Sequence, residues 1–164
     1  FRLCRLPYFQ NGELAAWLMQ KDLIAFLRES AGRPFAYGSD DCSLWLADWW
    51  LVNHGTDPAA ELRGTYASVE EKDALVASRR GLQRLVTALA NSAGARRTQF
   101  PNTGDFGLIV VHGRPYGAIC TGRAGTGLFW AVRAIEPGVV FLSNPRILRA
   151  WSINVGQDFS PGTL

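Results

Sequence analysis

A cysteine preceded by two acidic residues is the group in this sequence best suited to nucleophilic chemistry. Cys42 follows a Gly38-Ser39 turn and the pair Asp40-Asp41, and it opens an apolar segment that reads as a helix. A thiol at a helix N-terminus lies beside unpaired backbone N–H groups and the positive end of the helix dipole. That environment favours the thiolate, the form that attacks carbonyl carbon. Cys42 is therefore a candidate nucleophile, with Asp41 beside it in the candidate site.

The two acidic neighbours of this thiol allow two interpretations. As N-caps, Asp40 and Asp41 would accept hydrogen bonds from the first N–H groups of the helix, which is the usual role of aspartate at this position. Their negative charges would also raise the pKa of the thiol and oppose its activation. Cys42 itself has a second reading, as a small buried hydrophobic residue packed under the first turn of the helix. An active thiol at this position would need an imidazolium close by.

Only two histidines are present to supply a base. His54 lies twelve residues after Cys42 on the same expected helix, on the order of 18 Å away, which is beyond hydrogen-bond reach. We expect His54 to be a cation near the C-terminal end of that helix. His112 ends an expected strand and lies across the turn at 113–115 from Tyr116. His112 is the candidate base, and a histidine that faces solvent from a turn is the alternative.

The composition is that of an ordinary globular domain. The 164 residues are 48% hydrophobic and 19% charged, and no apolar run approaches the roughly 20 residues of a membrane span. The net charge is +3, and no run of Lys or Arg exceeds two residues, so nucleic-acid binding is not favoured. Cys4, Cys42 and Cys120 fit neither a disulfide framework nor a zinc site. We expect no metal or cofactor, and reduced thiols in a reducing compartment.

The elements that must position these residues fall into a helical half followed by a strand-rich half. Helical spacing and capping signals predict helices over about 11–30, 42–55, 68–80 and 81–89. Ser68 and Glu71 have the spacing of a capping box. Alternating apolar runs between Gly and Pro turns predict strands at 106–111, 116–120, 128–134, 139–143 and 147–155. Helices followed by consecutive antiparallel strands indicate an α+β fold.

The sequence also indicates how the chain divides. Met19 is the only methionine, so residues 1–18 are interpreted as an N-terminal extension upstream of a native start at Met19. Residues 19–164 are expected to form a single domain. The polar connector from Asn91 to Arg97 separates two halves of that domain better than it separates two domains.

Two short motifs resemble a known family. Tyr37-Gly38 followed by Asp41-Cys42-Ser43 is similar to the Tyr-Gly…Asp-Cys-Ser nucleophile motif of the NlpC family of papain-like cysteine peptidases. Gly104-Asp105 ahead of an apolar strand looks like the Gly-Asp that opens the first sheet strand there. The resemblance spans roughly residues 19–153. It implies a papain-like fold in which the Cys42 helix packs on an antiparallel sheet of about five strands.

The resemblance implies two functions, and both stay open at this point. The overall layout resembles a branch encoded in phages, prophages and gene-transfer-agent clusters beside tail proteins. If the chain has the activity of that family, Cys42 would hydrolyse murein peptides, with peptidoglycan as the substrate. The family's histidine opens a strand of the form His-Val-Gly-Ile, and the corresponding segment starts with Tyr116, which could bond Cys42 or a ligand, or be a core residue. The alternative is a catalytically inactive interaction module among phage tail proteins. The protein would then be located in the bacterial cytoplasm during assembly, or in the particle.

Overall fold

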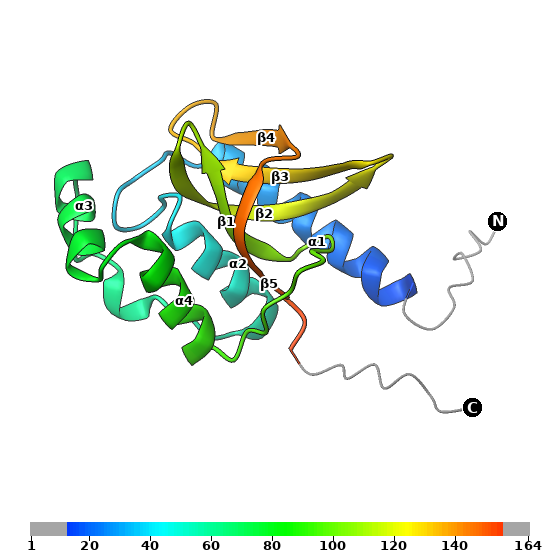
Figure 1. The fold of residues 1–164 in the computed structure, drawn as a ribbon, viewed down its shortest axis with the longest axis horizontal. Coiled ribbons are helices and arrows are strands. Elements are labelled where there is room, and N and C mark those ends of the chain that lie inside the picture. Colours follow the sequence, from blue (N-terminus) through cyan, green and yellow to red (C-terminus); the bar gives the residue numbers. More distant parts are fainter. Residues whose placement is uncertain (1–12, 156–164) are drawn as a thin grey trace, which may run out of the picture.

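The chain folds into a layer of helices packed against one antiparallel sheet (Figure 1). The computed structural model describes the backbone of residues 13–155 and the side chains from residue 22 onward. This is the α+β class that the sequence predicts, with the helices first and the strands after them. The elements are α1 (Glu13–Gly32), α2 (Leu44–His54), the short 3-10 helix η1 (Ala60–Leu62), α3 (Val69–Ser78), α4 (Leu82–Ser92), β1 (Phe106–Val111), β2 (Arg114–Ala124), β3 (Gly127–Arg133), β4 (Val139–Ser143) and β5 (Arg146–Trp151).

Helix α2 is the central helix, and most of its surface is buried, as its apolar sequence predicts. It begins at Leu44 rather than at Cys42. The N–H of Trp45 donates to the carbonyl of Asp41 at 2.9 Å, so Cys42 and Ser43 form the turn that leads into the helix. The buried residues of α2 are Leu44, Trp45, Leu46, Ala47, Trp49 and Trp50.

The capping box expected at residues 68–71 is confirmed. The Ser68 hydroxyl accepts the N–H of Glu71 at 3.2 Å, and the Glu71 carboxylate accepts the N–H of Ala67 at 2.7 Å. These bonds satisfy donors that the first turn of α3 would otherwise leave unpaired. A break at Gly81, which has a φ of 102°, separates α3 from α4.

The sheet has the order β4-β3-β2-β1-β5, and all its neighbouring strands are antiparallel. The four strands β1 to β4 follow one another as a meander, whereas β5 returns to pair with β1. Val111 pairs with Arg114, so only His112 and Gly113 form the β1–β2 turn. Both have a positive φ, 48° and 76°, which is the geometry of a tight type I′ hairpin.

Alternation along the strands gives the sheet two different faces. The helix face contacts α1 and α2, and the outer face forms a cluster made by the strands themselves. Buried strand residues of the helix-face cluster are Phe106, Leu108, Ile119, Ala131 and Trp151. Those of the outer-face cluster are Ile109, Ala118, Cys120, Leu128, Trp130, Val132 and Ala150.

The connector between the two halves is hydrogen-bonded to the last strand. Arg97 forms an isolated bridge with Trp151, and the N–H of Thr98 donates to the carbonyl of Ala150 at 3.0 Å. The N–H of Ser152 donates to the carbonyl of Arg96 at 2.8 Å. The helical half is therefore joined to the C-terminal strand on both sides of this bridge.

At the N-terminal side, α1 begins at Glu13, so the expected boundary at Met19 falls inside a helix. Residues 1–12 lie outside the described residues, and a native start at Met19 stays a prediction. Over residues 13–155, no helix combines the length and apolarity that crossing a bilayer requires.

Candidate functional site

The segment that presents Cys42 is a tight loop that folds back on itself. Ala36 and Asp40 form an antiparallel bridge, and the N–H of Asp40 donates to the carbonyl of Ala36 at 2.8 Å. Gly38, at the tip, has a φ of 76°, and any side chain there would collide with the backbone carbonyl of Tyr66. Only glycine satisfies both conditions without strain. The tip of the loop thus packs against the segment that carries Tyr66.

The side chain of Asp41 holds this loop in place through hydrogen bonds. Its carboxylate is fully buried and accepts four hydrogen bonds. Oδ1 accepts the N–H groups of Ser43 and Leu44 at 2.9 and 3.1 Å, so Asp41 accepts hydrogen bonds at the helix start as expected, although the N-cap residue of α2 is Ser43. Oδ2 accepts the N–H of Gly38 at 2.9 Å and the hydroxyl of Tyr66 at 2.6 Å. Burial and this bond to Asp41 raise the pKa of Tyr66.

Asp40 does not cap the helix, contrary to the sequence interpretation. Its carboxylate pairs with Arg33 at 2.7 Å and with Arg133 at 3.1 Å. The side chain of Arg133 is fully buried on β3 and also donates to the backbone carbonyls of Gly138 and Arg33, each at 2.8 Å. Asp40 therefore ties the loop to the sheet, and the buried guanidinium draws it away from the helix start.

Cys42 lies where the loop meets the sheet. Its carbonyl oxygen lies so close to Gly117 of β2 that a side chain there would overlap it. The half-buried thiol has a raised pKa, mainly because of burial and next because of the negative charge of Asp41. The positive charge of Lys72 and a hydrogen bond with Ser43 act in the opposite direction without reversing the shift. Cys42 is consequently a neutral thiol at neutral pH.

We expect Cys42 to react slowly with iodoacetamide at neutral pH. A thiol at the ordinary pKa of 9.0 is about 1% thiolate there, and the raised pKa of Cys42 makes its fraction smaller. The rate should rise only as the pH passes above about 9. Mass spectrometry of the alkylated peptide measures this rate against free cysteine. Buried Cys120, with its pKa raised to about 11, is the internal control and should react after unfolding only. Alkylation of Cys42 faster than free cysteine at mildly acidic pH would contradict the assignment.

Tyr116 does not lie beside Cys42, as it would if it took the place of a catalytic histidine there. It pairs with Ile109 and packs against the outer-face cluster, whereas the next residue, Gly117, lies on the helix face. Successive strand residues face opposite sides of a sheet, so Tyr116 and Cys42 lie on opposite faces. The reading of Tyr116 as a partly buried packing residue is the one that agrees with the structure.

The histidines are placed differently again. His112 is solvent-exposed in the β1–β2 turn, and the strand from Gly113 to Gly117 spans roughly 13 Å. His54 is at the far end of α2, where its Nε2 lies 2.7 Å from the carbonyl oxygen of Ile153. Neither histidine is among the groups that shift the pKa of Cys42. Of the predicted site residues, Asp41 and Cys42 therefore lie together in the loop, whereas His112 lies elsewhere, in the β1–β2 turn.

Pro115 is an exposed residue on the face of β2 that meets Cys42 at Gly117. It lies two residues before Gly117 on the same face of the strand, and it pairs with Val110 of β1. The pairing of β2 with β3 begins only at Ala118, so Pro115 has no partner on its other side and its missing N–H disrupts no ladder. A proline ring can neither accept nor donate a proton, so β2 presents no base on this side.

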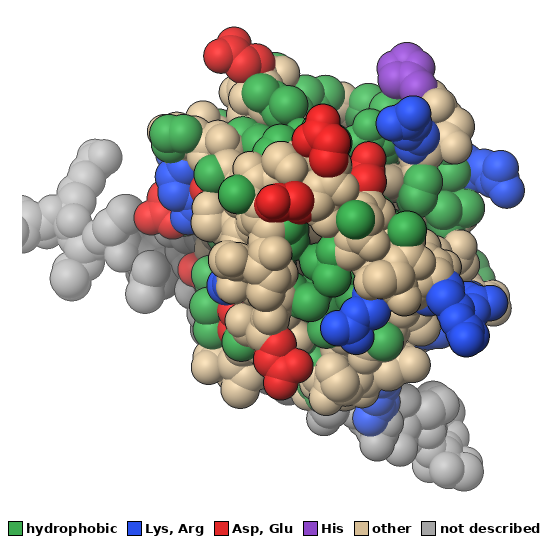
Figure 2. Space-filling model, turned by 90° about the vertical axis from the view of Figure 1, so that its left-hand side faces the viewer, with side chains coloured by type: hydrophobic (Ala, Val, Ile, Leu, Met, Phe, Trp, Pro, Cys, Tyr) green, Lys and Arg blue, Asp and Glu red, His purple; other side chains and the backbone are tan. Residues whose placement is uncertain are grey.

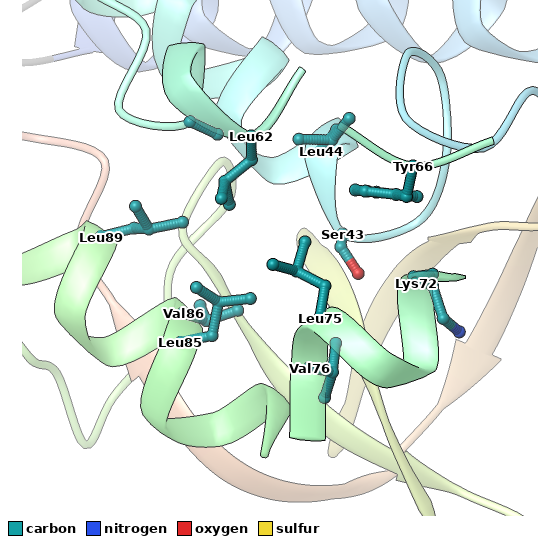
Figure 3. A pocket seen from close by; sticks show the side chains of 11 residues that line it. Ser43, Leu44, Leu62, Tyr66, Lys72, Leu75, Val76, Leu85, Val86 and Leu89 are labelled. Atoms are coloured by element: carbon teal, nitrogen blue, oxygen red, sulfur yellow. The ribbon is translucent and has the colours of Figure 1, made fainter. Parts of the chain in front are cut away.

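The space next to the loop is small and mainly apolar (Figure 3). Its volume is about 20 Å³, which is room for a single water molecule. Figure 3 shows the Ser43 hydroxyl and the Lys72 ammonium at one end and leucine and valine side chains from α3 and α4 at the other. In the described part of the chain, His, Cys, Asp and Glu nowhere form a group of three suited to a metal ion.

Comparison with known families places the chain. Residues 14–153 match a family described as a domain of unknown function, DUF6950. The chain belongs to the DUF6950 family. The matched span runs from the start of α1 to just beyond β5, so it includes the Cys42 loop and the whole sheet. Neither a curated protein nor a solved structure matches this DUF6950 domain.

Three residues of the site in this DUF6950 domain were missed by sequence reasoning. Tyr66, Lys72 and Arg133 reach the Asp40-Asp41-Cys42 segment from elements far along the chain. An arginine inside an otherwise apolar strand was the one signal for Arg133, because such a charge must find a buried partner. Tyr66 and Lys72 carried no comparable local signal.

Proposed function

We propose that this chain is an NlpC-type papain-like domain of phage or prophage origin that serves as a non-catalytic interaction module in a phage tail or a related particle. The similarity of its Tyr-Gly…Asp-Cys-Ser and Gly-Asp motifs to the NlpC family supports the ancestry. The four hydrogen bonds to buried Asp41 give the Cys42 loop an architectural role.

The observation that carries the non-catalytic role is Pro115 on the side of β2 that meets Cys42. Hydrolysis of a peptide by a cysteine nucleophile needs a base that takes the thiol proton and returns it to the leaving group. Tyr116 lies on the other face, and His112 is exposed at the turn. The raised pKa of the thiol leaves Cys42 protonated at neutral pH.

Incubation with soluble muropeptides tests this function. Wild type and Cys42→Ala should give the same background release of product, measured by liquid chromatography and mass spectrometry. Release by wild type that is lost in Cys42→Ala would overturn the non-catalytic role.

Introducing a base on the helix face of β2, at position 115, should activate the thiol. In Pro115→His an imidazole would stand on the helix face about 7 Å along β2 from Gly117, the residue that meets the backbone of Cys42. We expect alkylation of Cys42 at neutral pH to accelerate by about tenfold, because an imidazolium lowers a neighbouring thiol pKa. Pro115→Gln, with similar bulk and no titratable group, is the matched control. Equal rates in the two variants would show that position 115 does not face the thiol.

A second candidate function is murein peptide hydrolysis by Cys42 itself. The positive charge of Lys72, which lowers the pKa of the thiol, is the observation in its favour. In that case Lys72→Met would slow product release from muropeptides as much as Cys42→Ala does.

A further inference from the structure

A surface groove lies away from Cys42, between α4 and β5. It is a groove of about 430 Å³, which we call the arginine groove. Figure 2 views the end of the molecule where α3 and α4 lie, and blue Lys and Arg side chains gather toward one side of that face. The residues that line the groove are Arg80, Gln83, Arg84, Thr87, Ala88, Asn91 and Arg149.

The cations of this groove are not neutralised within the described chain. No lining residue is acidic, and Arg80, Arg84 and Arg149 form no ion pair with any described residue. Arg149 is held in place, because its Nη1 donates to the hydroxyl of Thr87 at 3.1 Å. Three guanidinium groups with free donors favour an anionic ligand, and carboxylates match their fork geometry.

A bulge in the sheet adds a fourth arginine on the same side. Arg149 pairs with Leu108, which belongs to the helix-face cluster, and Arg146 pairs with Val110, which faces the same side because it lies two residues further along β1. Residues three apart on a regular strand would face opposite sides. The register shift between Leu108 and Ile109 cancels that alternation. Positive charge therefore continues from the groove along β5 toward the open end of the sheet.

We propose that the arginine groove binds an acidic segment of a partner protein. This proposal rests on the proposed function, in which the domain acts by binding and not by hydrolysis. The amides of Gln83 and Asn91 both donate and accept hydrogen bonds, as a peptide backbone does, whereas phosphodiesters only accept. No aromatic side chain lines the groove, so nucleotide bases would find no surface on which to stack. A peptide bearing spaced carboxylates satisfies both the guanidinium and the amide groups.

The test measures fluorescence anisotropy of a fluorescein-labelled peptide of alternating glutamate and alanine with the whole chain at low salt. We expect saturable binding that weakens with added salt, and about tenfold weaker binding in Arg84→Glu and in Arg80→Glu. Arg123→Glu makes the same change of charge on an exposed residue at the β2–β3 end, away from the groove, and should bind like wild type. A peptide with glutamine in place of glutamate should not bind.

Four results would overturn the proposal. They are an absence of peptide binding, equal loss in Arg84→Glu and Arg123→Glu, tight binding of the glutamine peptide, and tighter binding of a single-stranded oligonucleotide of the same charge than of the glutamate peptide. Circular dichroism of each variant verifies that it is folded before binding is measured. The muropeptide assay fails or succeeds independently of these results, because Cys42 and Pro115 do not line the groove.

Discussion

Replacing Asp41 with alanine should destabilise the domain by about 3 to 5 kcal/mol, because it leaves buried donors without an acceptor. Two of these donors start α2, and the other two hold the loop at Gly38 and the hydroxyl of Tyr66. Three of the four hydrogen bonds are buried, so the donors of Gly38, Leu44 and Tyr66 cannot turn to water instead. Urea denaturation followed by circular dichroism measures the change in the free energy of unfolding.

Two further variants calibrate this result. Tyr66→Phe removes only the 2.6 Å bond from the hydroxyl and should cost about 1 kcal/mol. Asp73→Ala removes an exposed carboxylate from α3 and should change stability by less than about 0.5 kcal/mol. If Asp41→Ala lost no more stability than Asp73→Ala, the structural role of Asp41 would be wrong.

Arg133→Met should cause a loss of similar size, about 3 to 5 kcal/mol. The buried guanidinium is shared between the carboxylate of Asp40 and three backbone carbonyls, and methionine fills the volume without replacing any of these donors. The variant therefore leaves hydrogen-bond acceptors without a donor in the interface between the loop and β3.

Arg33→Met provides the matched control, because Arg33 pairs with the same carboxylate from a side chain that is 44% exposed. A solvent-exposed pair contributes less than about 1 kcal/mol. An equal decrease in the free energy of unfolding in the two variants, measured by the same denaturation curves, would mean that the buried Arg133 stabilises the fold no more than the exposed Arg33 does.

The elements predicted from the sequence agree best where local signals decide them. The capping box at Ser68 and Glu71 and the strands β1 and β4 are found as predicted, because capping and strand alternation depend on neighbouring residues. The extension of β2 to Ala124 was missed. A register shift between Cys120 and Gly122 lets this strand continue past a glycine that reads as its end.

The site was predictable only in part, for a physical reason. Asp41 as a cap follows from its place before an apolar helix, whereas the face on which Tyr116 lies depends on how β2 docks on α2. Nothing within β2 itself specifies that choice. The buried partner of Asp40, Arg133, is likewise 93 residues away, on β3. Contacts that join distant segments carry no periodicity in the sequence, so local patterns cannot reveal them.

The position of β5 bears on the order in which this chain can fold during synthesis. β5 is made last of the strands, yet it covers one side of β1 and is bonded to the connector at Thr98. Until residues 146–151 have left the ribosome, β1 is an unpaired edge, the kind of surface that pairs with other chains. The sheet of this domain is therefore completed only once residues 146–151 have been made, and a nascent chain stalled before β5 would be prone to aggregate.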